Sequence, residues 1–313
     1  MTRTIEGVLP ILHTPFDDAD EIDVPSLCRE VDWALEVGAD GVCSAMVSEV
    51  LRLTAQERIE LNRRIVEFTA GRGVVIGSVG AESTKQAVQF AQAACDAGCS
   101  AVMAIPPIST ALPDTALWEY FVSLADSVDV PLIVQDASSY VGKSISTDFY
   151  VRLLERFGSE KILFKPEGSP VGPNISDLRD ASGGQARMFD GSGGMLLIDA
   201  FRRGVAGTMP GVDLLDAIVA MWRALHRGDE SAAYRVYFPV CALVALQLQA
   251  GLDGFLAVEK YIMVRRQIFS SDRRRQPNSW SLDSETQAEV DRLLVMLADA
   301  LSATTDEDKS AGL

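Results

Sequence analysis

The segment Ile162-Leu-Phe-Lys165-Pro-Glu167 places a lysine at the end of a short apolar run. Three bulky apolar residues predict a buried strand, and Pro166 removes a backbone donor where that strand would end. A lysine is almost never fully buried without a partner or a function. In barrel folds, chemistry takes place at the carboxyl ends of the strands. The segment therefore predicts an amine at the mouth of a barrel, with the Glu167 carboxylate on the same side of the chain.

The same unit, an apolar strand followed by a helical pattern, recurs through residues 1–227. The predicted strands cover residues 7–16, 41–46, 74–79, 101–105, 132–134, 162–167, 188–190 and 204–209. Eight such units, at intervals of roughly 20–35 residues, exceed what an open sheet usually needs. The Gly-x-Ser-x-Gly elbow of an α/β hydrolase does not occur. The sequence therefore predicts an α/β fold, a (β/α)₈ TIM barrel.

The rest of the chain reads as helix. Helical patterns cover residues 231–250, 252–269 and 284–301, and a basic, proline-containing loop at 272–277 separates the last two. We expect a catalytic barrel over residues 1–227 and a C-terminal extension of three helices over 228–303. The charged residues 304–313 are predicted to be a frayed tail.

Composition excludes several classes of partner. The formal net charge is −16, which argues against nucleic acid and against anionic membrane surfaces. No run approaches 18 uninterrupted apolar residues, and the first residues lack a signal-like stretch. The five cysteines form no CxxC pair and predict free thiols in a reducing cytoplasm. With only His13 and His226, a histidine-rich metal site is not available, and we expect no metal or cofactor.

Lys165 has two interpretations. A lysine that forms a Schiff base must be neutral to attack a carbonyl, and burial among apolar side chains lowers the pKa of an amine. The alternative is a structural charge paired with Glu167 or another carboxylate at the barrel mouth. The local sequence leaves both interpretations open.

Polar residues also follow two other predicted strands. Ser48 and Glu49 come after the second strand, where they could bind an anion or handle a proton, or simply begin a helix. Gln135 and Asp136 close the fifth strand, where they could position a hydroxyl or make a turn. Tyr140 lies a few residues further on and could reach the mouth or merely pack.

A glycine-rich turn, Gly191-Ser192-Gly193-Gly194, lies between the seventh strand and its helix. Such a turn can present backbone N–H groups to a carboxylate or a phosphate. Barrels often bind phosphate near strands seven and eight, so a phosphorylated substrate competes with a carboxylic acid. A tight connection without a ligand is the third interpretation.

Several motifs occur together in one order. They are Gly7 to Phe16, Ser48-Glu49 with Leu53 to Arg58, Pro131 to Gly142, Phe164 to Glu167, Gly191 to Gly193 and Gly207 to Met209. Over residues 7 to about 270, this set resembles the dihydrodipicolinate synthase and N-acetylneuraminate lyase family of class I lyases. The resemblance implies that Lys165 condenses with the C2 carbonyl of pyruvate or another 2-oxo acid. It also implies a homotetramer built as a dimer of dimers.

The chain departs from that family at its proton relay. Ala45 to Glu49 replace the family's Gly-Thr-Thr-Gly-Glu, and Gln135 stands where synthases and lyases have a tyrosine. Tyr140 takes the place of the arginine that a synthase uses for its second substrate. Residues 107–109, Pro-Ile-Ser, replace the usual Pro-Tyr-Tyr. A relay of two tyrosines and a threonine cannot form in this chain.

These departures resemble the sugar-acid branch of the family, that of 2-keto-3-deoxy-L-arabinonate dehydratase and its relatives. The implied activity is a cofactor-free hydro-lyase acting on a 2-keto-3-deoxy sugar acid, with an aldolase from the same imine as a sibling reaction. One alternative is 4-hydroxy-tetrahydrodipicolinate synthase, which condenses pyruvate with aspartate semialdehyde. Another is a non-catalytic barrel that binds a 2-oxo acid.

The resemblance assigns roles to the polar residues at the barrel mouth. Lys165 is the nucleophile, and Glu167 or Glu49, with Gln135 and a water, handles protons. Residues expected to contact the substrate are Val47, Ser48, Asp136, Tyr140, Gly191, Ser192, Gly193 and Met209.

Overall fold

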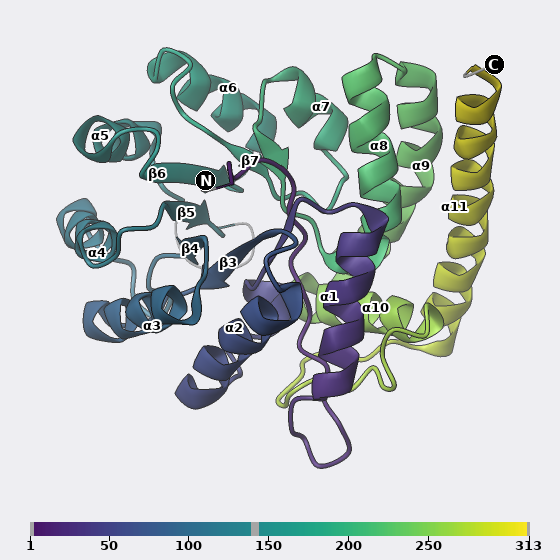
Figure 1. Cartoon of the computed structure of the whole chain (residues 1–313), viewed down its shortest axis with the longest axis horizontal. Helices are drawn as coiled ribbons and strands as arrows, with labels where there is room; N and C mark the ends of the chain where they lie inside the picture. Colours follow the sequence, from purple (N-terminus) through teal and green to yellow (C-terminus); the bar gives the residue numbers. More distant parts are fainter. Residues whose placement is uncertain (1–2, 139–143, 312–313) are drawn as a thin grey trace.

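The computed structural model describes residues 3–138 and 144–311, with side chains through residue 304. Strands and helices alternate along the chain, and the helices surround the strands (Figure 1). The strands are β1 (Gly7–Val8), β2 (Gly41–Cys43), β3 (Val74–Ser78), β4 (Ala101–Ala104), β5 (Leu132–Asp136), β6 (Ile162–Pro166), β7 (Phe189–Asp190) and β8 (Gly207–Thr208). The helices that follow them are α1 (Val24–Val37), α2 (Ala55–Thr69), α3 (Thr84–Ala97), α4 (Asp114–Asp126), α5 (Thr147–Phe157), α6 (Val171–Ala181), α7 (Leu197–Arg202) and α8 (Leu215–Arg227). Short 3₁₀ turns, η1 (Met46–Ser48) and η2 (Val212–Leu214), precede α2 and α8.

All strand pairs are parallel. One sheet has the order β2-β3-β4-β5-β6 and the other β1-β8-β7. Parallel bridges join the two sheets at both seams, Ile11 to Cys43 on one side and Phe164 to Met188 on the other. The eight strands therefore follow one another in a ring, which confirms the predicted (β/α)₈ barrel.

Most strands are shorter than predicted, and β1 and β8 are shortened most. The segment 7–16 forms regular ladder pairs only at Gly7 and Val8. Pro10 and Pro15 interrupt it, and a proline has no N–H to donate to a ladder. The predicted strand 204–209 is likewise reduced to Gly207–Thr208, and Pro210 follows shortly after it.

Alternation along the strands divides the core into two layers. Leu163 lies in the cluster that fills the barrel, together with Ile133, Met103 and Phe189. Phe164 points the other way and packs in the layer between strands and helices. Because side chains two residues apart share a face of a strand, Lys165 continues the inward row of Leu163. Its amine is therefore directed toward the barrel axis at the carboxyl end of β6.

The C-terminal extension holds three helices, α9 (Glu230–Gln247), α10 (Gly251–Arg265) and α11 (Ser284–Ala311). Helices α8, α9 and α11 run side by side, and α10 crosses at their end toward α1 (Figure 1). Helix α11 continues to Ala311, and the frayed tail expected at 304–313 stays a prediction. No proline or glycine interrupts the chain between Ser284 and Ala311, so nothing in that stretch ends the helix.

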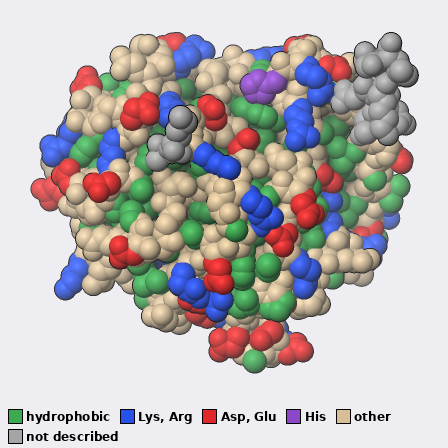
Figure 2. Space-filling model, viewed as in Figure 1, with side chains coloured by type: hydrophobic (Ala, Val, Ile, Leu, Met, Phe, Trp, Pro, Cys, Tyr) green, Lys and Arg blue, Asp and Glu red, His purple; other side chains and the backbone are tan. Residues whose placement is uncertain are grey.

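One stretch of the described chain, Glu230–Arg265, is long and apolar enough to cross a membrane, and half of its apolar window is buried in the protein. It consists of two helices, because η3 (Leu248–Ala250) and Gly251, with φ of 54°, separate α9 from α10. The net charge of −16 is not gathered into one acidic surface on the face seen in Figure 2, where acidic and basic side chains are interspersed.

Candidate active site

Lys165 lies at the carboxyl end of β6 and is 3% exposed. In the register of the sheet it pairs with Gln135 of β5. Its Nζ lies 3.2 Å from Oε1 of Glu167, which is its one partner among the described residues. The amine is thus buried, held by a single carboxylate and directed into the barrel mouth.

Glu167 connects Lys165 to Gln135. Its Oε2 accepts a hydrogen bond of 2.6 Å from Nε2 of Gln135, while its Oε1 faces the lysine. Burial raises the pKa of Glu167, and the nearby Lys165 charge and the Gln135 hydrogen bond partly oppose that rise. A carboxyl with a raised pKa beside an amine is suited to exchange protons with it.

These three side chains open into a cavity of about 40 Å³ at the barrel mouth. Seven of the predicted site residues line it together: Val47, Gln135, Lys165, Glu167, Gly191, Gly193 and Met209. The other lining residues are Ile11, Ala45, Met46, Gly211, Leu252, Phe255 and Glu259. Elements from β1 to α10 therefore contribute to one small chamber around the Lys165 amine.

Gly191 allows this arrangement because it has no side chain. A Cβ at this position would lie 2.6 Å from Cε of Lys165 and closer still to the Glu167 carboxylate. Ser192 does not face the chamber, because its Oγ accepts a hydrogen bond of 2.8 Å from Leu196 N. Its predicted substrate contact is therefore not supported, whereas the backbone of Gly191 and Gly193 does line the cavity.

The prediction that Ser48 and Glu49 act at the site is not supported by their geometry. The Ser48 hydroxyl donates to Leu12 O and accepts from Ala45 N, so its hydrogen-bonding capacity is used by backbone. The Glu49 carboxylate is ion paired with Lys260 and accepts a bond of 2.9 Å from Arg275 N. Neither side chain lines the cavity.

Asp136 stabilises a turn, which is the second of the two roles that the sequence left open for this residue. Its two oxygens accept hydrogen bonds from Ser138 N at 2.8 Å and from Ile145 N at 2.9 Å. It is absent from the cavity wall, so its predicted substrate contact is not supported. Tyr140 lies outside the described residues.

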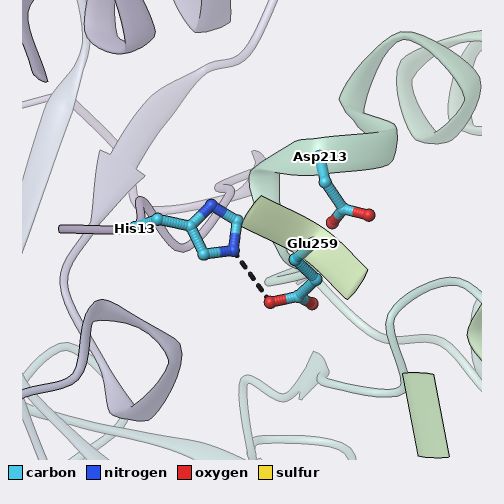
Figure 3. A group of neighbouring side chains, drawn as sticks. All are labelled: His13, Asp213 and Glu259. Atoms are coloured by element: carbon cyan, nitrogen blue, oxygen red, sulfur yellow. Dashed lines mark hydrogen bonds and ion pairs between the residues drawn. The ribbon is translucent and has the colours of Figure 1, made fainter. Parts of the chain in front are cut away.

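Glu259, a second carboxylate in the cavity wall, was not predicted from the sequence. It comes from α10, in the C-terminal extension, and its Oε2 lies 2.8 Å from Nε2 of His13 (Figure 3). The other ring nitrogen of His13 lies 3.4 Å from Glu30 of α1. Burial lowers the pKa of His13, but the two glutamates outweigh it and raise the pKa to about 10. His13 is therefore an imidazolium at neutral pH.

Asp213 of η2 completes this buried group (Figure 3). Burial, followed by the charge of Glu259, raises the pKa of Asp213 to about 7. The ligand atoms of His13, Asp213 and Glu259 lie within 4.8 Å of one another, close enough to surround a metal ion. Hydrogen bonds from His13 to Glu259 and from Gln247 to Asp213 hold these side chains in a buried polar network.

A larger hollow, of about 280 Å³, lies away from Lys165. It is bounded by the segment after β4, by residues 144–146 and by the start of α5, with Asp114 as the one charged residue in the described lining. Its described lining contains no lysine and no pair of charged side chains, so the chamber at Lys165 remains the candidate active site.

The fold and the site define a class of protein. A buried lysine at the carboxyl end of a barrel strand, beside a carboxyl with a raised pKa, is the arrangement of a Schiff-base lyase. Residues 4–291 match the Dihydrodipicolinate synthetase family. The chain belongs to this family, whose members are class I Schiff-base lyases.

Relatives with more specific names include two kinds of enzyme. The chain is 29% identical to the L-2-keto-3-deoxyarabonate dehydratase of Azospirillum brasilense over 91% of its own length and 92% of that protein. It is 28% identical to the 4-hydroxy-tetrahydrodipicolinate synthase of Methanosarcina mazei, over 76% of this chain and 81% of that one. The crystal structure of dihydrodipicolinate synthase from Rhodopseudomonas palustris superposes with a TM-score of 0.83 at 28% identity, covering 93% and 97% of the two chains.

Proposed function

We propose that the protein is a cofactor-free dehydratase acting on a 2-keto-3-deoxy sugar acid. The observation that carries the proposal is the contact of Lys165 with Glu167 inside the barrel chamber. The similarity to the dehydratase of Azospirillum brasilense, over nearly the whole of both chains, supports the same reaction.

The chamber residues suit each step of this reaction. The Lys165 amine attacks the C2 carbonyl, and loss of water gives an imine. The imine draws electrons from C3, and the Glu167 carboxylate takes the C3 proton to leave an enamine. The enamine electrons expel the C4 hydroxyl, which leaves as water with the proton that Glu167 returns. Hydrolysis of the imine then releases the product and restores the amine.

The synthase reaction is the second candidate, because synthases are among the relatives. Against it stands the composition of the chamber, whose described lining contains no tyrosine, threonine or serine. The tyrosine-based relay expected of a synthase has no counterpart there, whereas Glu167 can move protons without it. An aldolase that breaks C3–C4 from the same imine uses the same residues.

A panel of 2-oxo acids distinguishes these activities. Borohydride reduction during incubation with each acid should leave a covalent mass adduct on Lys165. Water loss and pyruvate release, measured in parallel with 2-keto-3-deoxy sugar acids, separate dehydratase from aldolase. Efficient turnover of pyruvate with aspartate semialdehyde would reverse the order of the two candidates. Adducts without turnover across the panel would instead support a non-catalytic barrel.

A homotetramer and a cytoplasmic location stay predictions. Light scattering coupled to size exclusion gives the mass of the assembly directly, and a dimer of dimers predicts four times the 33.8 kDa of one chain.

A further inference from the structure

Glu259 occupies an unusual place for a residue of the C-terminal extension. It lies in the same cavity wall as Lys165 and Glu167, although it comes from α10 rather than from a barrel strand. Its exposed fraction is 2%. A buried carboxylate in an active-site wall needs compensating charge and hydrogen bonds, or a ligand that supplies them.

The two oxygens of Glu259 differ. Oε2 is held by Nε2 of His13 at 2.8 Å, but no hydrogen bond within the described chain reaches Oε1. Gly211, which also lines the cavity, lies next to this oxygen. A Cβ on Gly211 would be 2.5 Å from Oε1, so a side chain there would cover it. The glycine keeps this oxygen accessible from the chamber.

Side chains on the side of Glu259 away from the cavity fix its position. His13, at the end of the β1 segment, is an imidazolium that is shared with Glu30 of α1. Asp213 of η2 is also near, and is itself held by a bond of 2.8 Å from Gln247 of α9. Further charged residues near this group are Lys260 on α10 with its partner Glu49, Arg266 directly after α10, and Lys165 with Glu167 in the same cavity wall.

An ionised carboxylate accepts hydrogen bonds and donates none. The same cavity wall contains the apolar residues Ile11, Leu252 and Phe255. The Asp213 carboxylate lies behind it, next to Gly211, and is not part of the described lining. The open Oε1 therefore suits a substrate hydroxyl and repels a substrate carboxylate. The carboxylate of a 2-oxo acid would then lie on the other side of Lys165, toward the backbone of Gly191 and Gly193.

We propose that Glu259 is a specificity-determining residue that binds a hydroxyl on the far end of the substrate through Oε1. The inference rests on the proposed function, since it assumes that the 2-oxo acid is bound to Lys165. It adds that the enzyme selects hydroxylated acids over plain ones, and that this selection comes from the C-terminal extension.

Two probes with the same number of carbon atoms test the inference. The first, 2-keto-3-deoxy-L-arabinonate, carries hydroxyl groups, and the second, 2-oxopentanoate, has none. The half-saturating concentration for borohydride trapping at Lys165 is measured with each. In Glu259→Gln, the amide oxygen can accept from His13 and its NH₂ then faces the chamber. We expect the value for the sugar acid to rise by roughly 10-fold or more, and that for 2-oxopentanoate to stay within about threefold.

Gly211→Ala is a second variant that changes no charge. Its Cβ would lie 2.5 Å from Oε1 of Glu259 and 2.8 Å from Oδ1 of Asp213, so both carboxylates must shift and Oε1 is covered. We expect the same selective loss, and the φ of −59° at this position accommodates alanine. Glu30→Gln is the matched control, because it also removes a carboxylate partner of His13 but does not line the cavity. It should affect both probes equally or not at all.

The outcomes separate the two proposals. If the wild-type protein traps neither acid, the Schiff-base function itself fails. If it traps both, and Glu259→Gln and Gly211→Ala change the two probes by the same factor, only the assignment of Glu259 is overturned. A selective loss in Glu30→Gln of the same size would also overturn it, since the effect would then come from His13 and not from the cavity wall.

Discussion

Two buried lysine–glutamate pairs occur among the described residues, and they differ in what surrounds the amine. Lys260 is fully buried, and its Nζ donates to Glu49, to Thr14 O at 2.7 Å and to Arg273 O at 2.9 Å. It also lies 4.5 Å from the centre of the Phe16 ring. Lys165 is buried almost as deeply but faces a cavity, with Glu167 as its one partner among the described residues.

The difference shows that burial alone does not make a lysine a nucleophile. Burial lowers the pKa of Lys260, as it would for a reactive amine, yet Glu49 and two carbonyl oxygens take up its three donor positions. An amine saturated in this way has no lone pair directed at a substrate. The Lys165 amine has Glu167 on one side and the cavity on the other, which leaves it accessible from the chamber. Four changes test this contrast.

The largest effect on turnover is expected when Lys165 is replaced by methionine, and the same substitution at Lys260 provides the comparison. Lys165→Met should lower turnover by roughly 10⁴-fold or more, and it should abolish the borohydride adduct, because no other amine lines the described cavity. Its stability should fall less than in the Lys260 variant, since the raised pKa of Glu167 lets that carboxyl take up a proton. Full activity in Lys165→Met would refute the mechanism.

Lys260→Met should lower the free energy of unfolding rather than the catalytic activity of the folded protein. Removing one member of a buried ion pair leaves an uncompensated charge, here Glu49, and typically costs about 3–5 kcal/mol. Urea unfolding measures this loss, and the folded fraction should still form the adduct at Lys165. Lys260→Met/Glu49→Gln should recover much of the stability, because both charges are gone. An adduct lost in Lys260→Met while the fold persists would show that the two pairs are not independent.

Glu167→Gln separates imine formation from proton transfer. We expect turnover to fall roughly 10²–10³-fold, while pyruvate still gives an adduct at Lys165. Because burial raises the pKa of Glu167 above 4.5 and the base must be ionised, wild-type kcat should fall as pH drops through that raised pKa. This acidic limb should be missing in Glu167→Gln. Unchanged turnover would assign the base to another group.

The smallest effect is expected at His13. It contacts Glu259, which lines the Lys165 cavity and directly precedes Lys260 in the chain. Its pKa is raised from 6.5 to about 10 in the folded protein. Its contribution to stability is therefore complete below about pH 6.5 and is lost as pH rises through 10. The melting temperature should fall by a few degrees between pH 7 and pH 10 in the wild-type protein, and less in His13→Gln. Parallel profiles would show that His13 is not charged.

Sequence periodicity predicted the barrel because each strand–helix unit carries its own apolar pattern. It predicted Lys165, Gln135 and Gly191 at the mouth, because residues that end parallel strands meet at one edge. It misplaced Glu49, whose positive φ of 55° turns the chain after η1 and directs the carboxylate toward Lys260. Residues other than glycine rarely adopt this conformation. A glutamate in the sequence therefore does not indicate that the chain turns at this position.

Glu259 and His13 were missed for a different reason. Each lies in an apolar run, where a single polar residue is usually a satisfied core group, and their contact joins the first barrel segment to α10. Only the tertiary position of α10 brings Glu259 to the cavity. The Glu259-Lys260 pair inside a buried helix was the one signal available, because two adjacent charges there each require a partner from elsewhere.

The late position of α10 in the chain also has a consequence for the folding of the protein during its synthesis. Ribosomes release His13, Glu30, Glu49 and Lys165 long before Glu259 and Lys260. Until α10 is made, Glu49 lacks the Lys260 partner that neutralises it in the folded protein. Lys165 is synthesised early, but the wall of its cavity is complete only after Leu252, Phe255 and Glu259 have emerged.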